Sequence, residues 1–333
     1  MPKSFLIIQT AFIGDVVLAT AMVEKLHRQY PDAQIDFLLR KGNEALLKGH
    51  PYLRQVLIWD KTNGKLKNLM RLLRQIRSQR YDAVINVQRF FATGLLTAFS
   101  GAKERIGFDK NPLHFLFDHS LPHGGLTTNG VLHETDRNQR LIADLTDAEP
   151  AKPRLYPSDA DRDFISQYQA EPYICVAPSS VWFTKQLPVE SWATFVKEAQ
   201  RKYQVYLIAG PNDHAVCEQV RTQAGGGCRI TNLAGELSLL QSVALQAGAK
   251  MNFVNDSGPL HFASATDAPV TAVFCSTVPA FGYGPLSTIS HIVEVDASLA
   301  CRPCGIHGKK ECPMGHFLCG RKIRVDQLLQ HLP

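Results

Sequence analysis

The stretch MNFVNDSGPLHFASA, residues 251–265, constrains the fold of this chain most strongly, because it predicts a buried strand that turns directly into a helix. Met251, Phe253 and Val254 have the apolar character of the strand. Pro259 fits the first helical turn, where its missing N–H is not needed. Such a helix start presents unpaired N–H groups and the positive end of its dipole, which favours a phosphate. An ordinary strand-to-helix turn explains the stretch equally well, so the rest of the chain has to decide.

A second strand-to-helix loop lies near the start of the chain. Residues 5–8 predict a strand and residues 16–26 a helix, with the loop TAFIGD between them. Asp15 ends this loop at the helix start, where an acidic side chain can cap the helix and complement its dipole. Alternatively, Asp15 projects from the carboxyl edge of the first strand, which is where open α/β sheets bind ligands.

Similar loops recur in the second half of the chain. A predicted strand at residues 173–177 leads through a polar loop to a helix that begins near Val189. Lys185 lies just before that helix, where its ammonium could meet a phosphate or simply be solvated. Repeated polar residues at the carboxyl ends of strands predict one ligand-binding edge in each domain. The sequence contains neither the dinucleotide fingerprint G-x-G-x-x-G nor the P-loop pattern, and it lacks a nucleophile elbow and an H-E-x-x-H motif.

The length of 333 residues exceeds one usual core and predicts two domains. Apolar residues make up 45% and charged residues 20%, which indicates a folded protein. The proline-rich segment at residues 149–158 is the best linker candidate. No uninterrupted apolar run reaches the roughly 18 to 20 residues of a membrane span. Polar residues also interrupt the apolar start of the chain, so a cytoplasmic location is expected rather than export.

A basic segment at residues 61–80 contains seven basic residues and no acidic one. Its leucines recur at helical spacing, so it predicts an amphipathic helix with a basic outer face. That face is either only solvated or contacts an anionic membrane surface. The net charge of +6 fits an anionic partner, but the segment lacks the interleaved aromatic residues of a nucleic-acid surface. Residues 94–129 show no period and predict loops and one short helix.

Four cysteines lie close together near the C-terminus, in CRPCGIHGKKECPMGHFLC. They are Cys301, Cys304, Cys312 and Cys319, and the first two form a C-x-x-C pair. The four thiols could hold a structural zinc ion, with His307 or His316 nearby. The separation between the pairs is shorter than in common zinc ribbons, so free thiols or a disulfide stay open as alternatives. Residues after 320 predict a short terminal helix.

Several segments match one known family in number, order and spacing. They are AFIGDVVLATAMV, YDAVINVQ, IGF, HETDRNQRL, APSSVWFTKQLPVESW, LAGELSLL, NDSGPLHFASA and CPMGHFLC. Together they resemble the ADP-heptose lipopolysaccharide heptosyltransferases, glycosyltransferase family 9, over nearly the whole chain. Each segment alone is a weak signal, whereas the set is specific.

The resemblance implies an α/β fold of the GT-B type, with two Rossmann-like parallel-sheet domains facing a cleft. Residues 1–157 would bind the acceptor and residues 158–320 the nucleotide sugar, while residues 321–333 would form a helix that crosses back to the first domain. The implied reaction is inverting transfer of a heptose or related sugar from an ADP-sugar to a hydroxyl of a lipopolysaccharide core. Asp15 matches the family's proposed catalytic base. The matching donor-binding candidates are Ser179, Ser180, Thr184, Lys185, Gly210, Asp256, Ser257, Gly258, Pro259 and His261.

The resemblance also implies partners: an ADP-sugar donor and a lipid-linked saccharide acceptor, with no nucleic acid and no cofactor required for catalysis. Contact with the inner-membrane surface would use the segment at residues 61–80. No acceptor-binding residue can be matched. Where relatives often have P-G-S and T-K-R-W-P, this chain has Pro178-Ser179-Ser180 and Thr184-Lys185-Gln186-Leu187-Pro188, which leaves the donor's base and sugar open. The alternatives are a sugar-nucleotide epimerase of similar fold and a non-catalytic basic protein that binds nucleotides or a membrane surface.

Overall fold

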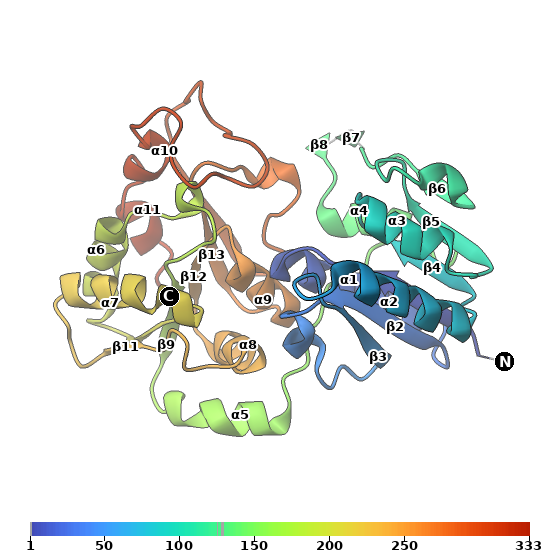
Figure 1. Ribbon diagram of the computed structural model, residues 1–333. Coiled ribbons are helices and arrows are strands. Elements are labelled where there is room, and N and C mark those ends of the chain that lie inside the picture. The colour runs from blue at the N-terminus through green and yellow to red at the C-terminus, as the bar shows by residue number, and fades with distance from the viewer. Residues whose placement is uncertain (1, 125, 128–129) are drawn as a thin grey trace. The chain divides into compact units, whose positions relative to one another are not determined.

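The chain divides into two compact units, residues 1–156 and 157–333. The computed structural model describes residues 2–124, 126–127 and 130–333. The division falls inside the proline-rich segment at residues 149–158, where proline restricts the backbone. Each unit contains its own six-stranded parallel sheet (Figure 1).

The sheet of the first unit has the strand order β3-β2-β1-β4-β5-β6, and every neighbouring pair is parallel. Its strands are β1 Ser4–Ile8, β2 Gln34–Arg40, β3 Leu53–Trp59, β4 Ala83–Asn86, β5 Glu104–Phe108 and β6 His119–Leu121. The order reverses between β1 and β4, because the chain first builds outward on one side of β1 and then returns to the other. Such a reversal is the usual place for a ligand in an open α/β sheet.

Helices cover this sheet because their apolar stripes match its buried faces. Helices α2 and α3 bury Leu72, Ile76 and Leu96 in a core that includes Leu6 and Val84 of the sheet. The helices of this unit are α1 Ile13–Gln29, α2 Lys65–Gln79, α3 Phe91–Ala98 and α4 Glu134–Arg140, with the 3-10 turns η1 Glu44–Leu47 and η2 His114–Leu116. A two-stranded antiparallel ribbon, β7 Leu126–Thr127 and β8 Gly130–Val131, stands apart from the sheet.

The sheet of the second unit repeats this plan, with the order β11-β10-β9-β12-β13-β14 and parallel pairing throughout. Its strands are β9 Tyr173–Ala177, β10 Gln204–Leu207, β11 Ile230–Asn232, β12 Asn252–Asn255, β13 Val270–Phe274 and β14 Ser290–Glu294. Here the order reverses between β9 and β12. The predicted strand at residues 251–254 is therefore a central strand of this sheet.

Two layers of helices enclose the second sheet. One core includes Trp192 and Phe195 of α6, and the other includes Leu245 of α8 and Leu260 of α9. The helices are α5 Asp159–Ile165, α6 Val189–Ala199, α7 His214–Gln223, α8 Leu239–Gly248, α9 Gly258–Thr266, α10 Leu318–Arg321 and α11 Asp326–Leu329. The 3-10 turns are η3 Ser166–Tyr168, η4 Phe183–Lys185, η5 Pro211–Asp213 and η6 Pro279–Phe281.

The structure differs from the sequence-based expectation at the C-terminus. Residues 321–333 were expected to form one helix, but this part of the chain contains the end of α10 and the separate short helix α11. Leu328 is fully buried in that unit's core, and α11 packs against α6. The hydroxyl of Tyr203 also donates a hydrogen bond to the carbonyl oxygen of Pro333. Burial of the apolar side chains in the nearest core explains why this segment packs there.

Two further expectations for the first unit need correction. The segment at residues 94–129 was expected to be loops and one short helix, but it supplies strands β5 and β6 to the sheet. Strands of five and three residues are too short to show a period in the sequence. The basic helix begins at Lys65, not at residue 61. Among the residues that the structure describes, no helix is long and apolar enough to cross a bilayer.

Candidate functional site

The reversal point of the second sheet brings together two residues from separate sequence motifs. Lys185 ends η4, in the loop after β9, and Asp256 follows β12 directly. The Lys185 ammonium lies 2.8 Å from a carboxylate oxygen of Asp256, and both side chains are largely buried. Lys185 is therefore not a solvated loop lysine. A buried positive charge at this edge is an anchor for an anion.

Helix α9 begins beside this ion pair. Ser257 is its N-cap residue, Gly258 and Pro259 open its first turn, and the buried His261 lies in the same turn. The Ser257 side chain makes no capping bond to the helix, since its hydroxyl donates to the carbonyl oxygen of Asn255, at 3.3 Å. The first-turn N–H groups and the helix dipole therefore add positive potential close to Lys185.

The carboxylate of Asp256 is held by a second partner that the candidate set did not include. The Thr277 hydroxyl donates a hydrogen bond to Asp256 over 2.6 Å. The guanidinium of Arg302 donates in turn to the carbonyl oxygens of Cys275 and Thr277, at 2.6 and 2.8 Å. Thr277 lies shortly after β13, and a polar residue near the carboxyl end of a strand is a signal that a sequence can offer. Nothing in the local pattern around Arg302 indicated its role.

The loop that carries Lys185 is fixed by the C-terminal loop of the second unit. The buried Thr184 hydroxyl accepts a hydrogen bond from the backbone N–H of Lys309, at 2.8 Å, and the Ser276 hydroxyl lies 2.9 Å from it. Gly308 has a φ of +72°, and a Cβ atom there would lie 2.8 Å from Cγ of Lys185. The C-terminal loop thus touches the stem of the lysine whose ammonium faces Asp256.

The other candidates lie in the loops after β9 and β10. The Ser179 hydroxyl donates to the Asp213 carboxylate, at 2.9 Å, and the Asp213 side chain makes no capping bond to α7. The backbone carbonyl of Ser180 accepts a hydrogen bond from the Gln186 side chain, at 2.6 Å. A Cβ atom at Gly210 would meet nothing within 4 Å, so this position is open.

In the first unit, Asp15 lies in the third position of α1, in the connection that follows β1. Its carboxylate accepts a hydrogen bond from the backbone N–H of Phe12, at 3.2 Å, which is the capping contact expected for an acidic residue here. The residue is nevertheless partly exposed. The Gln88 side chain, which follows β4, donates a hydrogen bond to Gln9, which follows β1. Asp15 therefore follows a strand at the reversal point of the first sheet.

Lys61 lies at the same edge and was assigned to the basic helix by its sequence alone. Its ammonium donates to the carbonyl oxygen and the hydroxyl of Thr10, at 3.0 and 3.2 Å. Burial, together with the nearby charges of Arg40 and Lys65, lowers the pKa of Lys61 to about 8. Lys61 thus supplies positive charge next to the loop that leads to Asp15.

All eight cysteines are free thiols in the structure. Cys304 donates a hydrogen bond to the carbonyl oxygen of Cys301, at 3.2 Å, and the backbone N–H of Phe317 donates to the sulfur of Cys312, at 3.4 Å. Burial and the neighbouring thiols raise the pKa of Cys319 to about 11. Among the described residues, no group of three or more His, Cys, Asp or Glu side chains is arranged to hold a metal ion.

The family model for glycosyltransferase family 9 (heptosyltransferase) matches residues 69–317. Two curated proteins are similar over most of their length. Lipopolysaccharide heptosyltransferase 3 of Escherichia coli K12 is 28% identical, over 79% of this chain and 80% of that protein. The lipopolysaccharide core heptosyltransferase OpsX of Haemophilus influenzae is 24% identical, over 98% of this chain and 93% of that protein.

A solved structure shares the whole architecture. The E. coli ADP-heptose lipopolysaccharide heptosyltransferase II superposes with a TM-score of 0.80, at 22% identity, and covers 99% of this chain and 97% of that one. This likeness and the two parallel sheets confirm the predicted GT-B fold.

Proposed function

The chain belongs to glycosyltransferase family 9, the heptosyltransferases, and from this premise we propose that it transfers a heptose from an ADP-activated donor to a hydroxyl of a lipopolysaccharide core. The names of the similar proteins support this reaction. The observation that carries the proposal is the buried pair of Lys185 and Asp256 beside the start of α9, at the reversal point of the second sheet. This arrangement suits a diphosphate that leaves as an anion.

The donor diphosphate needs positive potential when the bond to the sugar breaks. Lys185 would exchange its contact with Asp256 for a contact with phosphate oxygens, and the first turn of α9 would donate N–H groups to them. Before the donor binds, Asp256, itself held by the Thr277 hydroxyl, would keep the ammonium at this edge of the sheet. The remaining proposed donor contacts come from the loops after the strands: Ser179, Ser180, Thr184, Gly210, Ser257, Gly258, Pro259 and His261.

The acceptor hydroxyl needs a base when it attacks the anomeric carbon from the face opposite the leaving group. We assign this role to Asp15. An inverting glycosidase needs a second carboxyl group to protonate the departing oxygen, whereas a nucleoside diphosphate leaves already stabilised as an anion. The transfer therefore needs one carboxylate as the base and positive potential for the leaving diphosphate, and no second carboxyl group.

A panel of nucleotide sugars tests the donor. ADP-, UDP- and GDP-sugars are added separately and the melting temperature is measured, followed by turnover with a lipopolysaccharide core acceptor. We expect ADP-heptose to stabilise the protein most and to transfer its sugar only when acceptor is present. Stabilisation by UDP-sugars alone contradicts the donor assignment. A converted donor sugar without any acceptor would identify an epimerase instead.

Gly308→Ala should disturb Lys185 without removing any charge. The added methyl group contacts the lysine stem, whose two ends are fixed by the anchored Thr184 and by Asp256. Overpacking of this kind costs about 1–3 kcal/mol, so we expect the donor KM to rise about tenfold with a smaller change in kcat. Steady-state kinetics with varied ADP-heptose measure both constants.

Gly315→Ala is the matched control, because Gly315 lies in the same loop with a φ of +69°, and a Cβ atom there would meet nothing within 4 Å. Both variants impose the same backbone strain, and only Gly308→Ala touches Lys185. Equal donor KM values in the two variants contradict the proposed contact.

We also propose that the acceptor is reached at the cytoplasmic face of the inner membrane, since a lipopolysaccharide core is lipid-linked. We restrict the expected membrane contact, residues 61–80, to helix α2, Lys65–Gln79, because the ammonium of Lys61 binds to Thr10. The exposed cations of α2 support this contact through their attraction to anionic headgroups.

A further inference from the structure

Helix α3 exposes apolar side chains on the face that is not packed against the core. Thr93, Leu96 and Ala98 are buried, whereas Phe91 and Phe99 are 57% and 48% exposed. Phe91, Leu95 and Phe99 recur every four residues along the helix, and the partly buried Leu95 packs against the core between the two exposed rings. A helix that is apolar on all sides is expected inside a core or in contact with lipid. The outer face of α3 therefore requires a partner.

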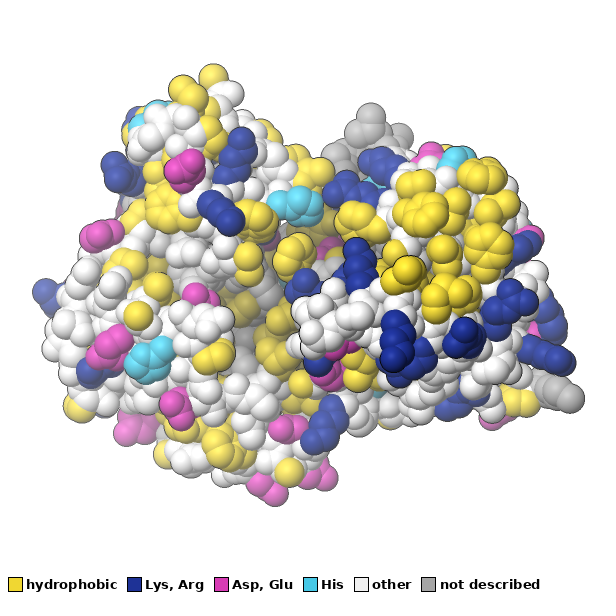
Figure 2. Space-filling model, in the orientation of Figure 1, with side chains coloured by type: hydrophobic (Ala, Val, Ile, Leu, Met, Phe, Trp, Pro, Cys, Tyr) yellow, Lys and Arg dark blue, Asp and Glu magenta, His cyan; other side chains and the backbone are white. Residues whose placement is uncertain are grey.

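The turn η2 extends this apolar face. Phe115 is 69% exposed, and Leu116 beside it is also exposed. Asn111 fixes the turn to α3, since its side-chain amide donates to the carbonyl oxygen of Phe90, at 3.1 Å. Figure 2 shows hydrophobic side chains gathered over this part of the first unit. We name Phe90, Phe91, Phe99, Phe115 and Leu116 the aromatic patch.

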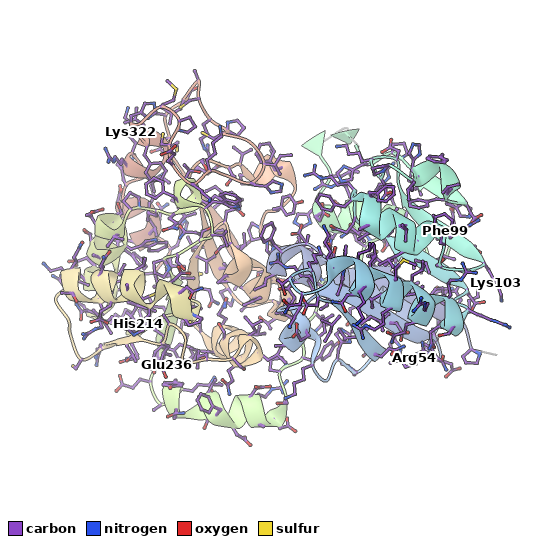
Figure 3. All side chains as sticks on the ribbon, in the orientation of Figure 1. Arg54, Phe99, Lys103, His214, Glu236 and Lys322 are labelled. Atoms are coloured by element: carbon purple, nitrogen blue, oxygen red, sulfur yellow. The ribbon has the colours of Figure 1, made fainter. Side chains whose placement is uncertain are left out.

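Basic side chains border the aromatic patch along α2. Helix α2 exposes Lys65, Lys67, Arg71, Arg74 and Arg77 and contains no acidic residue. Its Arg77 donates a hydrogen bond to the carbonyl oxygen of Phe99, at 3.2 Å, so the two surfaces meet. Phe99 is labelled at the end of α3 in Figure 3, and Figure 2 shows Lys and Arg side chains along α2 next to the hydrophobic ones.

We infer that the aromatic patch and the outer face of α2 together dock on an anionic phospholipid bilayer. Aromatic side chains suit the boundary between headgroups and acyl chains, where their rings leave water. Each cation near an anionic bilayer adds about 1 kcal/mol of attraction. The positive charge of α2 thus favours an anionic bilayer as the partner, because a neutral apolar partner would gain no electrostatic attraction from these exposed cations. The inference rests on the proposed action on a lipid-linked acceptor and adds the apolar half of the contact.

Vesicle sedimentation tests the inference with the full chain. Phosphatidylglycerol-rich vesicles, free of lipopolysaccharide, are compared with pure phosphatidylcholine vesicles. We expect wild-type protein to bind the anionic vesicles and the triple variant Phe91→Ala/Phe99→Ala/Phe115→Ala to bind them at least about tenfold more weakly. Arg71→Glu/Arg74→Glu should abolish the preference for anionic lipid.

Matched controls lie on the second unit. Phe164, Ile289 and Ile292 are exposed apolar residues there, and Lys250 and Lys322 are exposed lysines, the second labelled in Figure 3. Phe164→Ala/Ile289→Ala/Ile292→Ala likewise removes three exposed apolar side chains, and Lys250→Glu/Lys322→Glu makes the same change in net charge. Both should bind vesicles like the wild type. Melting temperatures confirm that all variants fold.

Three outcomes overturn the inference. The patch variant could bind vesicles as tightly as the wild type, or the control variants could lose as much vesicle binding as the patch variant. In the third, the wild type self-associates and does not bind vesicles, and the patch variant no longer self-associates, which would make the patch an interface between copies. Turnover on a lipid-free core saccharide distinguishes failure of the docking inference from failure of the proposed function. Protein that binds vesicles but transfers no heptose refutes the function alone. Protein that transfers heptose but ignores vesicles refutes the docking alone.

Discussion

Asp15→Asn should lower kcat for heptosyl transfer by about 10²-fold or more, while the affinity for ADP-heptose changes by less than about twofold. The amide cannot take the proton of the acceptor hydroxyl, but its oxygen can still accept the hydrogen bond from the Phe12 N–H that caps α1. The variant should therefore fold normally. Single-turnover kinetics at saturating donor, together with calorimetry of donor binding, separate the two effects.

The same substitution at Asp161 provides the control. Asp161 also occupies the third position of a helix, α5, and accepts a hydrogen bond from the backbone N–H of its N-cap residue, Ser158, at 2.9 Å. Asp161→Asn thus makes the same chemical change in the same capping geometry, and turnover should stay at the wild-type rate. Near-normal turnover of Asp15→Asn would leave Asp15 with a capping role only.

Lys185→Ala should weaken binding of ADP-heptose by about 10² to 10³-fold, because it acts in two ways. It removes the cation proposed to contact the diphosphate, and it leaves the carboxylate of Asp256 buried without its ionic partner. That unpaired negative charge would repel the phosphates. Calorimetric titration with ADP and with ADP-heptose measures the loss.

The double variant Lys185→Ala/Asp256→Asn distinguishes the two contributions. Neutralising Asp256 removes the repulsion, so the double variant should bind ADP more tightly than Lys185→Ala, though still more weakly than the wild type. Thr277 can donate to the new amide oxygen, which preserves the local hydrogen bond. Unchanged ADP affinity in Lys185→Ala would count against any phosphate contact of this lysine.

The meeting of Lys185 and Asp256 followed from the sequence because both residues follow predicted parallel strands. The carboxyl ends of parallel strands share one edge of the sheet, and the structure makes β9 and β12 neighbours, so two loops that are distant in the chain lie side by side. Their direct ion pair was not predictable, since strand order sets which edge a loop occupies and not which side chains touch. Arg302 was missed for the same reason, because its contacts are to backbone carbonyls that no residue pattern identifies.

The first unit was predicted less completely. Strands β5 and β6 lie among glycine, proline and aromatic residues, and their pairing with the sheet, not their own pattern, makes them strands. The exposed aromatic patch escaped notice because a sequence does not tell which of two apolar helix faces is buried. Lys61 was grouped with the basic helix by composition, whereas its ammonium turns inward to Thr10.

The carboxylate of Asp256 would make the proposed phosphate site selective before any substrate binds. A small monovalent anion offers Lys185 no more charge than the aspartate already in place, and it does not bring the aspartate's covalent anchoring. A diphosphate brings several oxygens that reach the lysine and the start of α9 at once. Chloride and acetate in the surrounding solution should therefore compete poorly with Asp256 for the Lys185 ammonium. Ligands that carry multiple negative charges should bind there in preference.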